Sequence, residues 1–127
     1  MKKILLIDDL REFRITRDDA DYAIARTTVE GVQAVQADGE WDEIWLDHDL
    51  GKIDGIKTDV LPVLAVFEER AVWDNPVKVG TVFVHTSNGS GADTMYRSLL
   101  HYGYNARRVD ADDYFFVPAE NMVTDED

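Results

Sequence analysis

Short apolar runs that end in polar residues are the main pattern along this chain. Residues 3–7, 44–46 and 82–84 consist almost wholly of Ile, Leu, Val, Phe and Trp. Runs this short, without polar alternation, are typical of strands buried on both faces in a parallel sheet. The longer segments between them carry apolar residues at helical spacing. We therefore predict a domain in which strands and helices alternate.

The complete strands extend beyond these runs. We place the central strands at 41–46 and 77–84, and a further strand at 22–27, where apolar and polar residues alternate loosely. A fifth strand, at one edge of the sheet, is predicted at 105–109. Residues 10–21 are charged and poorly periodic, so we expect a loop or a short, weak helix there.

Three helices are predicted from their caps and their apolar stripes. Thr27, followed three residues later by Glu30, fits a capping box, and the helix that it opens ends near Gly39. Asp59 and Ser90 are candidate caps for the other two, and Gly103 is a suitable stop for the last. The stripes consist of Val32 and Val35; of Val60, Val63, Leu64 and Phe67; and of Ala92, Met95, Tyr96, Leu99 and Leu100.

The order of these elements predicts the fold class. Strands joined by helices imply right-handed crossovers and a five-stranded parallel sheet covered on both faces, a doubly wound three-layer α/β domain. With 127 residues, the chain is expected to form one domain over 1–127, with an acidic tail from about 118. Residues 51–57 are expected to be a glycine-bearing loop. The aromatic patch at 114–116 covers an edge of the core or, alternatively, contacts a protein partner.

Charge and composition exclude several classes of function. A net charge of −13 repels nucleic-acid backbones and anionic membranes, so extended nucleic-acid binding is not expected. The absence of cysteine excludes thiolate zinc sites, disulfides and cysteine nucleophiles. No apolar run approaches the length of a membrane span, and the N-terminal run is too short for a signal peptide. We therefore expect a cytoplasmic protein.

The candidate site is the set of polar residues that follow the strands. The carboxyl ends of parallel strands meet at one edge of the sheet, where ligands of such folds bind. Carboxylates are hard oxygen ligands, so clustered aspartates there predict a Mg²⁺ or Mn²⁺ site. The candidate metal ligands are Asp8, Asp9, Asp47 and Asp49.

Other residues at this edge fit phosphate chemistry. His85 and His48 are candidate general acids or bases, although His85 could instead be a buried structural histidine and strand alternation turns His48 away from its neighbours. Arg11 offers a fork for phosphate, or else pairs with the acidic cluster. Ser87, Asn88 and Gly89 precede or open a helix whose N–H groups suit an anion; the alternative for Ser87 is that it only caps or turns the chain.

The acidic residues resemble the pattern of response-regulator receiver domains. Asp8 and Asp9 follow the first strand, Asp47 follows the third, and the pair Asp54-Gly55 lies at receiver spacing beyond it. The resemblance extends to about residue 109. It implies that Asp8, Asp9 and Asp47 hold magnesium, helped by the backbone carbonyl at position 49, with Asp47 as the phosphoryl acceptor. The receiver lysine after the fifth strand is missing, since no lysine follows residue 78, which argues against ordinary phosphorelay.

The sequence resembles more closely a receiver-like family associated with processing of cyclic phosphates. The motifs are Asp-Asp-x-Arg at 8–11, Leu-Asp-His-Asp-Leu-Gly at 46–51 and His-x-Ser-Asn at 85–88. This resemblance implies a metal-dependent phosphoesterase that acts on a cyclic nucleotide or on an RNA 2′,3′-cyclic phosphate end, with Asp47 in its reactive centre. The alternatives are a degenerate receiver that signals or binds, and an acidic interaction protein that mimics nucleic acid.

Overall fold

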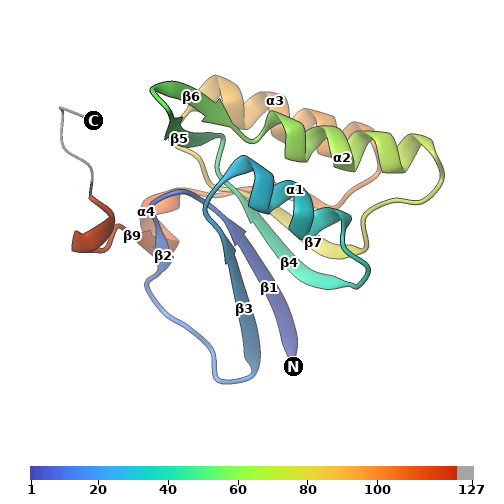
Figure 1. The fold of residues 1–127 in the computed structure, drawn as a ribbon. Coiled ribbons are helices and arrows are strands. Elements are labelled where there is room, and N and C mark those ends of the chain that lie inside the picture. Colours follow the sequence, from blue (N-terminus) through green and yellow to red (C-terminus); the bar gives the residue numbers. More distant parts are fainter. Residues whose placement is uncertain (123–127) are drawn as a thin grey trace.

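A parallel sheet of five strands forms the centre of the protein. The computed structural model describes residues 1–122, and its sheet has the strand order β3-β1-β4-β7-β8 (Figure 1). This order confirms the receiver/flavodoxin-like α/β fold and places its switch point between β1 and β4. The strands are β1 (Lys2–Ile7), β3 (Ala20–Ala25), β4 (Trp41–Leu46), β7 (Val79–Val84) and β8 (Ala106–Arg108).

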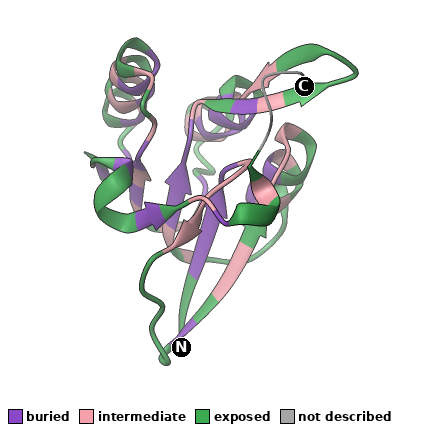
Figure 2. Cartoon of the chain, turned by 90° about the vertical axis from the view of Figure 1, so that its left-hand side faces the viewer, coloured by how far each residue is buried: buried purple, intermediate pink, exposed green. Residues whose placement is uncertain are grey.

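The three long helices cover one face of this sheet. They are α1 (Thr28–Gln36), α2 (Leu61–Val72) and α3 (Gly89–His101), and they lie side by side in Figure 1. Alternate residues of β1, β4 and β7 point toward them and form the main core, which includes Leu5, Ile7, Ile44, Leu46, Val82 and Val84. Of the predicted stripe on α3, Leu100 is 45% exposed and does not join this core. Figure 2 shows that burial is concentrated in the central strands.

A thinner, aromatic layer covers the opposite face. It is built from β2 (Glu12–Phe13), α4 (Ala111–Tyr114) and β9 (Phe115–Phe116), with β2 antiparallel to β9. Residues 10–21 therefore contain a two-residue strand and no helix, and β3 already begins within them. The reason is long-range packing: Phe13 lies edge-on to Trp45, with ring centroids 5.3 Å apart. Trp45 in turn stacks on Phe83 at 4.0 Å.

A hairpin replaces the loop expected over 51–57. It consists of β5 (Asp49–Ile53) and β6 (Ile56–Asp59), which pair in antiparallel fashion. Asp54 and Gly55 both have positive φ, 52° and 78°, as a two-residue turn of type I′ requires. The Asp-Gly pair that contributed to the receiver resemblance is thus the turn of a hairpin.

Two of the predicted helix ends are confirmed. The Thr27 side chain accepts a hydrogen bond from the backbone N–H of Glu30, which makes Thr27 the N-cap of α1. Gly103, just beyond α3, has a φ of 90°, the left-handed conformation that its predicted role requires. A short 3-10 helix, η1 (Ala119–Asn121), lies near the end of the described chain.

The other two predicted caps differ from the structure. Asn88, rather than Ser90, caps α3 by accepting a hydrogen bond from the N–H of Gly91. The N-cap residue of α2 is Val60 and has no side-chain cap bond. Asp59 nevertheless accepts a hydrogen bond from the N–H of Leu61 at 2.9 Å. In both cases the helix begins one or two residues away from the position that the pattern predicted.

Two expectations concern the chain outside this core. In residues 1–122, no helix has the length and hydrophobicity that crossing a bilayer requires. The first residues of the acidic tail predicted from about 118 are Pro118 and the short helix η1. Its remainder, 123–127, lies outside the described residues.

Candidate metal and phosphate site

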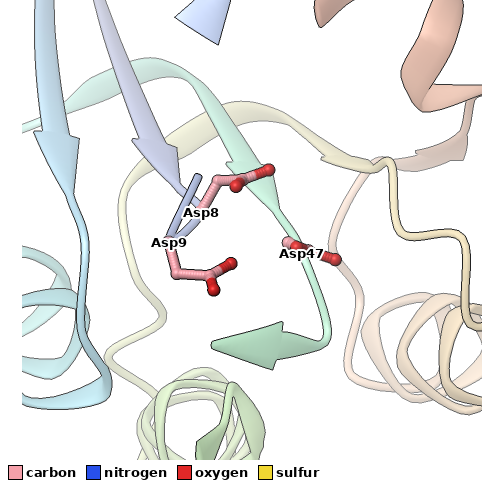
Figure 3. A group of neighbouring side chains, drawn as sticks. All are labelled: Asp8, Asp9 and Asp47. Atoms are coloured by element: carbon pink, nitrogen blue, oxygen red, sulfur yellow. The ribbon is translucent and has the colours of Figure 1, made fainter. Parts of the chain in front are cut away.

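Three carboxylates converge where two neighbouring strands end. Asp8 directly follows β1 and Asp47 directly follows β4, and the last residues of these strands, Ile7 and Leu46, are register partners. One carboxylate oxygen from each of Asp8, Asp9 and Asp47 lies within 4.8 Å of the others (Figure 3). Asp8 and Asp47 are buried, with exposed fractions of 0% and 4%. The register of two adjacent strands therefore brings together three of the four carboxylates that the sequence predicted as metal ligands.

Asp8 is held in place by several hydrogen bonds. Its Oδ1 accepts from the backbone N–H groups of Leu10 and Arg11, at 2.8 and 2.9 Å. Its Oδ2 lies 2.9 Å from Nε2 of His85. Burial by itself raises the pKa of Asp8, but the hydrogen bonds from His85 and the backbone outweigh it and hold the pKa below its ordinary value. Asp8 is thus a fixed, ionised carboxylate.

The pKa values of Asp9 and Asp47 are both raised by their position in the cluster. Burial and the charges of Asp8 and Asp47 raise the pKa of Asp9 to about 6. Burial and the charge of Asp8 also raise the pKa of Asp47. Both shifts reflect buried carboxylates that repel each other, and a divalent cation between them would relieve that repulsion. A donor set made only of carboxylates fits Mg²⁺ or Mn²⁺.

Arg11 pairs with this cluster. Its Nη1 lies 3.2 Å from Oδ2 of Asp47 and 3.4 Å from Oδ2 of Asp8. Arg26 fixes the surrounding loop, because its Nη1 donates to the carbonyl of Arg11 at 2.7 Å. Of the two roles predicted for Arg11, pairing with the carboxylates is the one that the structure contains. The guanidinium is also the cation nearest to Asp47 among the ion pairs of residues 1–122.

His85 lies beneath Asp8. Its side chain is completely buried, and its ring packs against Phe115 with centroids 4.4 Å apart. A carboxylate can only accept a hydrogen bond, so Nε2 of His85 carries the proton that faces Asp8. Nδ1 has no hydrogen-bond partner among the described residues. This geometry fits a residue that positions Asp8, because the ring has no exposed surface from which to reach a substrate.

His48 and Asp49 form a separate pair. Nδ1 of His48 lies 2.9 Å from Oδ1 of Asp49, and Asn88 approaches both side chains at 3.5 Å. The ring packs on Gly91 of α3, where a Cβ would lie 2.6 Å from Cδ2 of His48. Contrary to the prediction, the structure therefore does not bring the Asp49 carboxylate into the cluster of Asp8, Asp9 and Asp47. Asp49 begins β5, which directs its 65% exposed side chain to His48 instead.

Three adjoining hollows surround the cluster. The central one, of about 240 Å³, contains Asp9 and Asp47. A larger hollow of about 680 Å³ shares Arg11 and Ser87 with it and also includes Gly89 and Arg108. A third, of about 400 Å³, shares Asp49 and Gly51 with the central hollow and extends along the β5–β6 hairpin. The predicted phosphate-binding residues Ser87, Asn88 and Gly89 all line at least one of these hollows.

Sequence reasoning missed several basic residues of this region. Arg108 ends β8 and lines the largest hollow. Lys52 and Lys57 line the hairpin hollow. Their signal was present in the sequence, because Asp54-Gly55 flanked symmetrically by Ile and Lys is a hairpin pattern that places these lysines opposite each other.

Comparison with known proteins gives one match. The family model described as the cyclic-phosphate processing receiver domain matches residues 3–101, well over half of the chain. Neither the curated proteins nor the solved structures include a match. The matched range includes the three strand ends that carry Asp8, Asp47 and His85, in agreement with the resemblance noted in the sequence. The chain therefore belongs to the cyclic-phosphate processing receiver domain family.

Proposed function

We propose that this protein hydrolyses a cyclic phosphodiester with the help of Mg²⁺ or Mn²⁺. The observation that carries the proposal is the cluster of Asp8, Asp9 and Asp47 at one edge of the sheet. Membership of a family named for cyclic-phosphate processing supports the substrate class. The adjoining hollows provide space for a phosphate ester next to the carboxylates.

The three aspartates would hold the cation. Their carboxylates already lie close together, and the raised pKa values of Asp9 and Asp47 indicate negative charge that is incompletely compensated. When bound, the metal would polarise a phosphoryl oxygen and lower the pKa of a bound water. His85 would keep the Asp8 carboxylate in one orientation, as residues behind metal ligands commonly do.

Arg11 would bind the phosphate. Its guanidinium now compensates Asp8 and Asp47, and a cation at the carboxylates would free it to form paired hydrogen bonds with phosphoryl oxygens. The N-terminus of α3 faces the same region, and Gly89 at its first position lines the hollow that also contains Arg11. A helix N-terminus favours anions.

We assign proton transfer to His48. The hydrogen bond from Nδ1–H to Asp49 leaves the lone pair on Nε2, so the ring can accept a proton from an attacking water. The new bond forms between the water oxygen and phosphorus, and the bond from phosphorus to one ring oxygen breaks. The leaving oxygen then takes a proton from solvent water, and His48 returns its proton to solvent, which yields a phosphomonoester and a hydroxyl group.

The experiment is a ring-opening assay followed by phosphorus NMR. Adenosine 2′,3′-cyclic phosphate, adenosine 3′,5′-cyclic phosphate and a short RNA with a 2′,3′-cyclic end are incubated with the protein and Mg²⁺ or Mn²⁺. We expect at least one to become a phosphomonoester, with loss of the activity in Asp47→Asn. Asp18→Asn, on the exposed surface, is the matched control and should be fully active. Failure of all three substrates to open would contradict the proposal.

A further inference from the structure

The β5–β6 hairpin holds two lysines side by side. Lys52 and Lys57 are directly opposite each other in the antiparallel register, so their side chains share one face of the ribbon. Neither forms an ion pair within residues 1–122. Like charges directly opposite each other destabilise a hairpin, and this chain has acidic residues in excess elsewhere. The pair is thus a local concentration of positive charge with no carboxylate at ion-pair distance among the described residues.

The lysines lie next to the carboxylate cluster. Gly51, which precedes Lys52, is so close to Asp9 that a Cβ would lie 2.9 Å from Oδ2 of Asp9. Figure 3 shows the β5 strand passing beside the cluster. The two lysines line the hollow of about 400 Å³ that shares Asp49 and Gly51 with the central hollow. A ligand bound at the aspartates could therefore extend directly along the hairpin.

The lining of this hollow is suited to an anion. Besides the lysines it contains Thr58, Asn88 and the carboxylate of Asp49, whose Oδ1 lies 2.9 Å from Nδ1 of His48. None of the lining residues is aromatic, so the hollow offers no surface on which a base would stack. Thr58 donates its hydroxyl proton to the carbonyls of Leu50 and Gly51, which fixes the base of the hairpin. Ammonium groups on flexible stems are common phosphate ligands.

We propose that Lys52 and Lys57 form a subsite for a second phosphate group of the substrate. The preferred ligand carries two phosphates, one bound at the aspartates and the other between the lysines. The identity of the first phosphate rests on the proposed function. The second phosphate interacts with residues outside the metal cluster, so its contribution can be measured by binding alone.

The test is calorimetric titration in the presence of Mg²⁺. The probes are adenosine 3′,5′-bisphosphate and adenosine 5′-monophosphate, and the variant is Lys52→Gln with Lys57→Gln. The control is Lys78→Gln, which removes one positive charge from an exposed position just before β7, at the opposite end of the sheet. We expect the double variant to bind the bisphosphate about tenfold more weakly or worse, because hydrogen bonds to charged groups are lost. Its affinity for the monophosphate should match that of Lys78→Gln.

A second variant guards against damage to the hairpin. Lys52→Arg with Lys57→Arg keeps both charges and should retain the affinity for the bisphosphate. The Gln double variant should melt no lower than the wild-type protein, since it removes like-charge repulsion. Equal bisphosphate affinities for the Gln double variant and Lys78→Gln would overturn the subsite. If the wild-type protein still opens cyclic mononucleotides, that result leaves the proposed function intact. If no cyclic phosphate is opened but bisphosphate binding depends on the two lysines, only the proposed function is refuted.

Discussion

Two substitutions of His85 distinguish between two roles of this residue, the positioning of Asp8 and the transfer of a proton. His85 is completely buried, and its Nε2 lies 2.9 Å from Oδ2 of Asp8. The side-chain amide of Gln can donate a hydrogen bond from nearly the same place as Nε2, but it cannot exchange a proton at neutral pH. Leu fills a similar volume and donates nothing. His85→Gln and His85→Leu therefore differ mainly in the hydrogen bond to Asp8.

The size of the expected effects follows from the hydrogen bond between His85 and Asp8. A hydrogen bond to a charged partner contributes about 1.5–3 kcal/mol, and its loss in a buried place leaves the carboxylate poorly solvated. We expect His85→Leu to lower the free energy of unfolding by about that amount. Loss of a residue that orients a metal ligand typically costs about 10–100-fold in metal affinity or activity. His85→Gln should retain both the stability and the Mn²⁺ affinity to within a few-fold.

The assay measures three quantities on one preparation of each variant: urea unfolding, Mn²⁺ affinity by calorimetry, and the rate of ring opening. If His85 only positions Asp8, the rate in His85→Gln follows the Mn²⁺ affinity and stays near the wild-type value. A loss of about 10²–10⁴-fold in rate, with normal stability and Mn²⁺ affinity, would refute this reasoning and make His85 a proton donor or acceptor.

Three further predictions concern neighbouring residues. Because the pKa of Asp9 is raised to about 6, the folded metal-free protein holds a proton that the unfolded chain loses near pH 4, so the contribution of Asp9 to the free energy of unfolding falls as the pH rises from about 4 to 6. Mg²⁺ should therefore raise the melting temperature more at pH 7 than at pH 5; equal shifts would contradict the cluster. Gly91→Ala should displace the His48 ring and slow ring opening while Mg²⁺ affinity is unchanged, since its Cβ would lie 2.6 Å from that ring. Small phosphodonors should leave little stable acyl phosphate on Asp47 by intact-mass measurement, and a stoichiometric gain absent in Asp47→Asn would favour receiver signalling.

The sequence predicted the parts of the site that depend on local pattern and parallel topology. Buried parallel strands appear in the sequence as apolar runs, and the carboxyl ends of adjacent parallel strands lie at the same edge of the sheet. Asp8 and Asp47 therefore converge as expected, because Ile7 and Leu46 are register partners. The family membership followed from the same strand-end motifs.

The features that the sequence did not reveal depend on contacts between distant segments. The short strand at Glu12–Phe13 exists because it pairs with Phe115–Phe116. This partner is far away in the sequence, so the local pattern around residue 12 does not indicate a strand. The sequence makes both histidines candidates for proton transfer, and burial distinguishes them. The His85 side chain is completely buried, whereas that of His48, in the segment between β4 and β5, is 17% exposed and packs against Gly91 of α3. The sequence predicts Asp49 as a metal ligand because it predicts a loop where the structure has a hairpin, and this hairpin directs the carboxylate to His48.

The most direct test compares metal binding with metal-dependent ring opening. Mn²⁺ is titrated into metal-free protein by calorimetry, and the rate of ring opening is measured over the same concentrations with the cyclic phosphate that the NMR assay identifies. If Asp8, Asp9 and Asp47 hold the ion that supports hydrolysis, the two curves reach half-saturation at the same Mn²⁺ concentration, and Asp9→Asn shifts both together. Full-rate ring opening in protein treated with a chelator, or no saturable Mn²⁺ binding, would contradict the account.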